Sequence, residues 1–130
     1  MTNQEREELA VQFKHNGRNC CQATMEALTC DDPAFDDKRE LISHIGAGFR
    51  TGMGCLEATC GALIGAGIVA GIKTEGQDTA KLTAQMMREF TELSGANICK
   101  VLKSKRPDGS FVCDCDDCVR HAVRVYQKLK

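Results

Sequence analysis

The thiols of cysteine are the groups in this sequence best suited to chemistry, because nine of them occur among 130 residues. Thiolates attack disulfides, bind metal ions and form reversible disulfides with one another. The nine residues are spread over almost the whole chain, at Cys20, Cys21, Cys30, Cys55, Cys60, Cys99, Cys113, Cys115 and Cys118. Any site that uses several of them must therefore be assembled by the fold.

Cys115 and Cys118 form a C-x-x-C pair at the expected start of a helix, within the segment Cys113-Asp114-Cys115-Asp116-Asp117-Cys118. Two thiols at this spacing can form a reversible disulfide or face one metal ion. The aspartates between them can cap the helix, but their negative charge is expected to disfavour a thiolate. A purely structural capping segment is the alternative.

Cys60 lies in the most apolar stretch of the chain, Ala58 to Ile72, in which small residues recur at four-residue intervals. Close helix packing explains these small residues by itself, and such packing could also press Cys60 against thiols of neighbouring helices. If the helix begins near Thr59, Cys60 lies in its first turn, where the helix dipole lowers the pKa of a thiol. Glu57 would oppose that shift.

The remaining chemical groups carry weaker signals. Adjacent cysteines seldom bond to each other, so we expect only one of Cys20 and Cys21 to join a site. Cys30 is expected to be an ordinary boundary thiol. Solvated side chains are expected for His15, His44 and His121, of which His44 is the best candidate for a role in a site. Core positions are expected for Met25, Met53, Met86 and Met87.

Helical periodicity predicts an all-α bundle of about five to seven helices around a central helix rich in small residues. Capping patterns at Thr2 and Asn19 open the first two helices. The third helix is expected to be capped by Asp36-Asp37 and to carry Leu41, Ile42 and Ile45. The apolar helix with Cys60 follows, and after it a helix from Asp78 to about Ser94 that carries Leu82, Met86, Phe90 and Leu93. A short helix with Cys99 and a last helix from near Asp114 complete the bundle.

Composition narrows the class of protein. The length fits one domain over residues 1–130, and the net charge of −1 with few aromatic residues argues against nucleic-acid binding. The longest apolar stretch is too short to cross a membrane. An acidic, polar N-terminal segment is unlike a secretion signal and predicts a cytoplasmic protein, where clustered cysteines indicate redox chemistry or metal binding.

Four segments together resemble a small family of redox-active proteins named for its C_GCAxxG_C_C cysteine pattern. They are Gly17-Arg18-Asn19-Cys20-Cys21-Gln22-Ala23, Cys60-Gly61-Ala62-Leu63-Ile64-Gly65, Ser94-Gly95-Ala96-Asn97-Ile98-Cys99 and Cys118-Val119. The resemblance implies that Cys20, Cys60, Cys99 and Cys118 are the family cysteines. It also implies a redox role, as an oxidoreductase or an electron carrier. Cys21, Cys55, Cys113 and Cys115 exceed the basic four.

The leading hypothesis is that the four family cysteines converge and form a redox centre. They would exchange thiols and disulfides with a redox partner protein or a small electron donor or acceptor. Alternatively they would bind an iron–sulfur cluster, with Cys115 and Cys21 as secondary candidates for ligands. A zinc-stabilised scaffold that binds a protein is the non-redox hypothesis. The small-residue helix could also serve the interface of a homo-oligomer.

Overall fold

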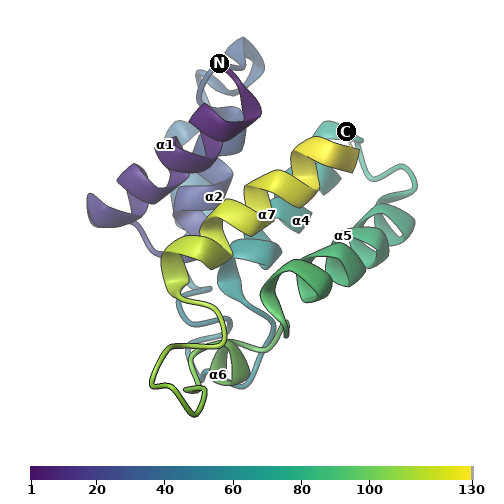
Figure 1. Ribbon diagram of the computed structural model, residues 1–130. Helices are drawn as coiled ribbons and strands as arrows, with labels where there is room; N and C mark the ends of the chain where they lie inside the picture. Colours follow the sequence, from purple (N-terminus) through teal and green to yellow (C-terminus); the bar gives the residue numbers. More distant parts are fainter. Residues whose placement is uncertain (130) are drawn as a thin grey trace.

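The computed structural model describes residues 1–129 and forms helices without a β-strand over that range (Figure 1). The α-helices are α1 (Asn3–His15), α2 (Cys20–Thr29), α3 (Arg39–Ala47), α4 (Gly61–Lys73), α5 (Thr79–Ser94), α6 (Cys99–Leu102) and α7 (Cys115–Leu129), and a 3-10 turn, η1, spans Pro33–Phe35. The all-α prediction is confirmed.

The first two helices begin where the capping patterns predict. The Thr2 hydroxyl accepts a hydrogen bond from the backbone N–H of Glu5, and the Glu5 carboxylate accepts one from the backbone N–H of Thr2. Asn19 and Gln22 form the same reciprocal pair at the start of α2. Each pair satisfies backbone donors that a helix start leaves without partners, which fixes the first residue of α2.

Helix α2 lies at the centre of the packing, in contact with α1, α3, α4 and α7, and α7 runs between α1 and α5 (Figure 1). The small residues of α4 allow its close approach to α2. A Cβ atom on Gly65 would lie 2.7 Å from the carbonyl oxygen of Cys21, closer than real side chains approach. The predicted role of the small residues in close helix packing is therefore confirmed.

Helix α5 ends as expected, whereas α3 begins differently from the prediction. Gly95 ends α5 with a φ of 85°, the left-handed conformation that glycine adopts readily. Helix α3 starts at Arg39 after Lys38, with no side-chain cap, so the prediction that Asp36-Asp37 caps it is wrong. Asp36 instead forms an ion pair with Arg39 across 3.2 Å.

Some of the residues that the helical pattern places in the core are exposed. The largest side chains of the buried core come from several helices and include Phe90, Met25, Leu28, Met86 and Leu102. Four residues predicted to be core or core-facing are exposed: Leu41, Ile45, Met53 and Leu93. The reason in α3 is that this helix packs chiefly against α2, and a single neighbour covers only one stripe of it.

No helix within residues 1–129 is long and apolar enough to cross a membrane. The apolar helix α4 is instead largely buried among its neighbours.

Candidate functional site

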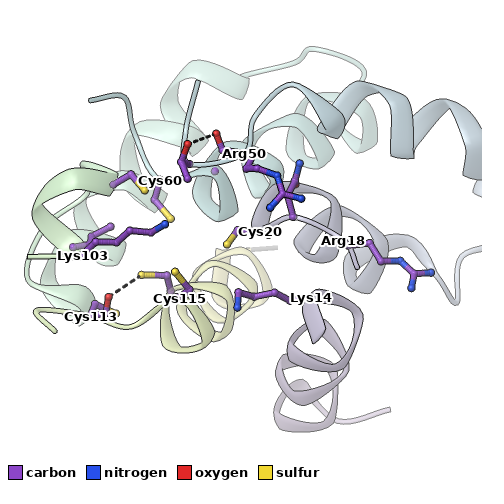
Figure 2. Close-up of a pocket in the computed structure, with 14 residues that line it drawn as sticks. Lys14, Arg18, Cys20, Arg50, Cys60, Lys103, Cys113 and Cys115 are labelled. Carbon is purple, nitrogen blue, oxygen red and sulfur yellow. Dashed lines mark hydrogen bonds between the residues drawn. The ribbon is translucent and has the colours of Figure 1, made fainter. Parts of the chain in front are cut away.

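Six cysteines line one half-enclosed cavity of about 250 Å³. The four family cysteines are among them, so residues separated by up to 98 positions in the sequence meet at one place. The six are Cys20, Cys60, Cys99, Cys113, Cys115 and Cys118. Figure 2 shows the sulfur atoms of Cys20, Cys60 and Cys115 directed toward a shared space.

Helix starts bring most of these thiols together. Cys20 is the first residue of α2, Cys115 is the first of α7, and Cys118 follows one turn later. The start of α2 is tied to the end of α3, because the Asn19 side chain donates to the carbonyl of Gly46 across 3.1 Å. Helix starts concentrate unpaired backbone N–H groups, so this arrangement favours negative charge in the cavity.

Cys60 precedes α4 rather than lying in its first turn, so that prediction is wrong by one position. Its backbone N–H donates to the carbonyl of Asn97 across 2.8 Å, and its backbone is not helical, with φ −50° and ψ 131°. The thiol of Cys118 lowers the pKa of Cys60, and the backbone N–H groups of Ala62 and Leu63 lower it further. The net shift is thus downward, and another thiol contributes more to it than the backbone N–H groups at the helix start that the sequence indicated.

Backbone hydrogen bonds between loops position Cys99 and Cys113. The N–H of Cys99 donates to the carbonyl of Ala58 across 3.0 Å, and that of Cys113 donates to Leu102 across 3.0 Å. The first bond joins the start of α6 to the loop before α4, and the second folds the segment between α6 and α7 back onto α6. As a result, Cys113 lies beside the thiols of α7 instead of out in solvent, and it is 7% exposed.

Cys20 and Cys115 form the outer pair of the cavity, and both are only partly buried. A hydrogen bond from the Cys20 thiol lowers the pKa of Cys115 to about 6, and the charges of Lys103 and Lys14 add to this effect. The same hydrogen bond, together with burial, raises the pKa of Cys20. At neutral pH the pair therefore consists of a thiolate at Cys115 and a thiol at Cys20.

Cys118, Cys60 and Cys113 form the inner group, and all three are buried. Cys118 interacts with both of the others, and these contacts raise its pKa. The contact with Cys118 lowers the pKa of Cys113 to about 5, and His121 and Ser94 stabilise the same thiolate. Thus Cys118 is the protonated member of the group.

The charge of Asp114 disfavours the neighbouring thiolate as predicted, because it raises the pKa of Cys115. Cys20, Lys103 and Lys14 outweigh it and lower that pKa to about 6. The carboxylates have other partners: Asp114 caps α7 by accepting from the backbone of Asp117 across 2.8 Å, and Asp116 accepts from Lys14 across 3.0 Å. The capping part of the prediction is therefore confirmed.

His121 is a site residue that sequence reasoning missed, since it was expected to be solvated. Its Nδ1 lies 2.8 Å from the Ser94 hydroxyl and 3.8 Å from the Cys113 sulfur. Its ring also meets Phe90 edge to face. The available signal was its position three residues after Cys118, which places both side chains on one face of α7.

The other histidines lie outside the cavity. His44 has a side chain that is 71% exposed and lies 3.9 Å from Glu40, so it is not a participant. His15 is also exposed, and it forms a hydrogen bond with Asp116 across 2.9 Å. Solvation is thus confirmed for these two residues.

The remaining cysteines belong neither to the outer pair nor to the inner group. Cys21 is fully buried and does not line the cavity, and burial raises its pKa to about 12. Burial also raises the pKa of Cys99, which lines the cavity wall. Cys30 is a boundary thiol as expected, and Cys55 is exposed.

The iron–sulfur and zinc alternatives can be compared with this geometry. All nine cysteines are free thiols. Among residues 1–129, no three or more Cys, His, Asp or Glu side chains are arranged so that they could hold a metal ion. The thiols are arranged as an outer pair, Cys20 and Cys115, and an inner group of three, Cys60, Cys113 and Cys118.

Comparisons with known proteins agree with the cysteine pattern. The family model described as "Putative redox-active protein (C_GCAxxG_C_C)" matches residues 18–129, which include all six cysteines of the cavity. Searches of curated proteins and of solved structures found no match. The matched range covers most of the chain, and this protein therefore belongs to the C_GCAxxG_C_C family of redox-active proteins.

Proposed function

We propose that the protein exchanges thiols and disulfides through its cavity, with Cys115 as the attacking thiolate and Cys20 as the resolving thiol. The observation that carries this proposal is the outer pair itself. A partly exposed thiolate with a pKa of about 6 lies beside a thiol that stays protonated. A thiolate attacks disulfides, and a neighbouring thiol completes the exchange.

The reaction proceeds in two balanced steps. The Cys115 thiolate attacks one sulfur of a partner's disulfide; a new S–S bond forms, the partner's bond breaks, and half of the partner leaves as a thiolate that takes a proton. Cys20 then loses its proton and attacks the Cys115 sulfur; the bond between Cys115 and the second half breaks, and that half leaves as a thiolate that takes a proton, so one of the two protons comes from Cys20 and one from water. The partner gains two electrons and two protons, and Cys20 and Cys115 become a disulfide.

The inner group would serve as a second dithiol. Cys60 and Cys118 interact with each other, and the charge at Cys60 also raises the pKa of Cys20 across the cavity. Attack by the Cys60 thiolate on the oxidised outer pair, followed by Cys118, would restore the outer dithiol and leave Cys60 and Cys118 as the disulfide. An external thiol donor would then reduce the inner pair. Cys99 would shape the cavity wall beside them.

The experiment starts from protein purified without oxygen, whose visible spectrum, metal content and thiol count are recorded before and after reduction. Disulfide exchange predicts colourless, metal-free protein that gains two or more thiols on reduction of an oxidised sample. Bound iron with sulfide-to-iron absorption bands would contradict the proposal in favour of a cluster. Zinc with four protein ligands would contradict it in favour of the scaffold, and nine inert thiols would exclude both redox mechanisms.

Matched serine variants assign the effect to the cavity. Cys115→Ser should abolish reaction with an added disulfide, and Cys20→Ser should stop the reaction at a mixed disulfide on Cys115. Cys60→Ser should abolish repeated turnover with an external thiol donor. Cys30→Ser and Cys55→Ser remove thiols outside the cavity and should leave both readouts unchanged. Equal tolerance of all five changes would overturn the assignment.

A further inference from the structure

Apart from the thiolates, the charged side chains that the structure describes along the cysteine cavity are all positive. Among the described residues that line it are four cations, Lys14, Arg18, Arg50 and Lys103, and no carboxylate. The chain as a whole has a net charge of −1, so this concentration is local. Partly enclosed cavities with one sign of charge attract ligands of the opposite sign.

Two of the four cations already have carboxylate partners. Lys14 lies 3.0 Å from Asp116, and Arg18 lies 2.7 Å from Glu26. Figure 2 also shows the Arg18 side chain directed away from the sulfur atoms. These two residues therefore contribute little charge that a ligand could neutralise.

Arg50 and Lys103 are different, because no ion pair within residues 1–129 engages either side chain. Arg50 lies in the loop after α3, and Lys103 directly follows α6. In Figure 2 the Lys103 side chain reaches toward the Cys60 sulfur, and the Arg50 side chain lies on the other side of the cavity opening, nearer to Cys20. The charge of Lys103 acts on Cys115, whose pKa it helps to lower.

We propose that the substrate is a small anionic disulfide, whose carboxylate groups bind Arg50 and Lys103 on the two sides of the cavity while its S–S bond meets the Cys115 thiolate. This inference rests on the thiol/disulfide exchange proposed above and names its substrate class. A guanidinium and an ammonium group bind a carboxylate through charge-assisted hydrogen bonds. They would also offset the repulsion between an anionic substrate and the thiolates in the cavity.

The test uses three probes of similar size and different charge. Dithiodipropionate carries two negative charges, bis(2-hydroxyethyl) disulfide is neutral, and cystamine carries two positive charges. The rate of each with the reduced protein is followed by the loss of the Cys115 thiol in peptide maps. The readout is the ratio of the anionic rate to the cationic rate, because a change in the thiolate's own reactivity affects all three probes alike.

Neutral variants identify the cations responsible. We expect Arg50→Gln and Lys103→Gln each to lower the ratio by about five- to tenfold, and the double variant to lower it further. Added salt should lower the ratio in the wild type and have less effect in the double variant. Arg88→Gln and Lys81→Gln alter exposed cations of α5 outside the cavity and should leave the ratio unchanged.

The outcomes separate this inference from the proposed function. If the neutral probe reacts and the Arg50 and Lys103 variants keep the wild-type ratio, the anionic substrate class is wrong while exchange stands. If no probe, including the neutral one, reacts with a cavity thiol, the exchange function fails and the substrate class fails with it.

Discussion

The sulfur atom of Cys113 lies 3.8 Å from Nδ1 of His121, and the same nitrogen lies 2.8 Å from the hydroxyl of Ser94. Three segments meet here: the end of α5, the residue two before α7, and the second turn of α7. The imidazole thus connects a buried thiolate to a hydroxyl group. This contact gives the inner group of thiols a polar neighbour that is not a cysteine.

Replacement of His121 by phenylalanine should raise the pKa of Cys113 above its value of about 5, because one of its stabilising contacts is lost. The ultraviolet absorbance of the thiolate, recorded during a pH titration, measures this pKa, and its midpoint should move to higher pH in the variant. His44→Phe is the matched control, since His44 is exposed and lies outside the cavity. Superimposable titrations of the wild type and His121→Phe would show that His121 only fills space.

Alkylation of Cys115 should depend on pH with a midpoint of about 6. The thiolate is the reactive form, so the rate should be constant above this pH and fall tenfold for each unit below it. Cys20→Ala removes the hydrogen bond that contributes most to the low value, and the midpoint should move up toward the ordinary thiol pKa of about 8.5. Peptide mapping after iodoacetamide labelling, in a Cys55→Ser background, provides the measurement. A midpoint that stays in place without Cys20 would remove the evidence for the pair.

Gly65 and Gly67 should respond in opposite ways to alanine. A Cβ atom at Gly65 would meet the Cys21 carbonyl at 2.7 Å, so Gly65→Ala must separate α4 from α2 and should destabilise the protein by about 1–3 kcal/mol. A Cβ atom at Gly67 would meet only Thr83, at an ordinary 3.5 Å, and alanine there should stabilise the helix by up to about 1 kcal/mol. Urea unfolding measures both. Equal free energies of unfolding for the two variants would contradict the close α2–α4 contact.

The ion pair between Arg6 and Asp31 should make stability depend on pH in the acid range. Both guanidinium NH groups donate to the carboxylate, at 2.9 and 2.7 Å, and this contact lowers the pKa of Asp31 to about 2. Its contribution is present above pH ~4 and is lost as the pH falls toward 2, since the folded-state pKa lies below the unfolded one. Because the carboxylate is half exposed, we expect only about 1 kcal/mol.

Asp31→Asn isolates this contribution. The difference in free energy of unfolding between the wild type and the variant should be constant from pH 7 to pH 5 and should shrink between pH 4 and pH 3. Urea denaturation at each pH gives the values. A difference that is the same at pH 3 and pH 6 would show that the carboxylate charge does not stabilise the fold.

Features set by local sequence could be predicted. The reciprocal caps at Thr2 and Asn19 and the glycine stop at Gly95 depend on neighbouring residues, and each lies where the sequence placed it. The convergence of the four family cysteines came from a resemblance that spans most of the chain. No helical pattern could have shown it, because periodicity says which face is apolar but not which helices meet.

Features set by long-range backbone contacts could not be predicted. The donation from Cys113 to Leu102 brings an additional thiol into the cavity, and nothing in the residue types indicates that the loop folds back. Likewise, Cys60 donates to Asn97, a residue 37 positions away, and α4 begins only after it, at Gly61. The low pKa of Cys115 then follows from its meeting with Cys20, a residue 95 positions away.

The central claim is that Cys20 and Cys115 cycle between dithiol and disulfide, and a redox titration with mass-spectrometric mapping tests it most directly. The protein is equilibrated in buffers of graded reduced and oxidised dithiothreitol, quenched in acid and digested. The account predicts a peptide pair linked through Cys20 and Cys115 that appears as the buffer becomes oxidising and disappears on return to reducing buffer. A chain in which both residues stay unlinked thiols across the whole range would contradict it.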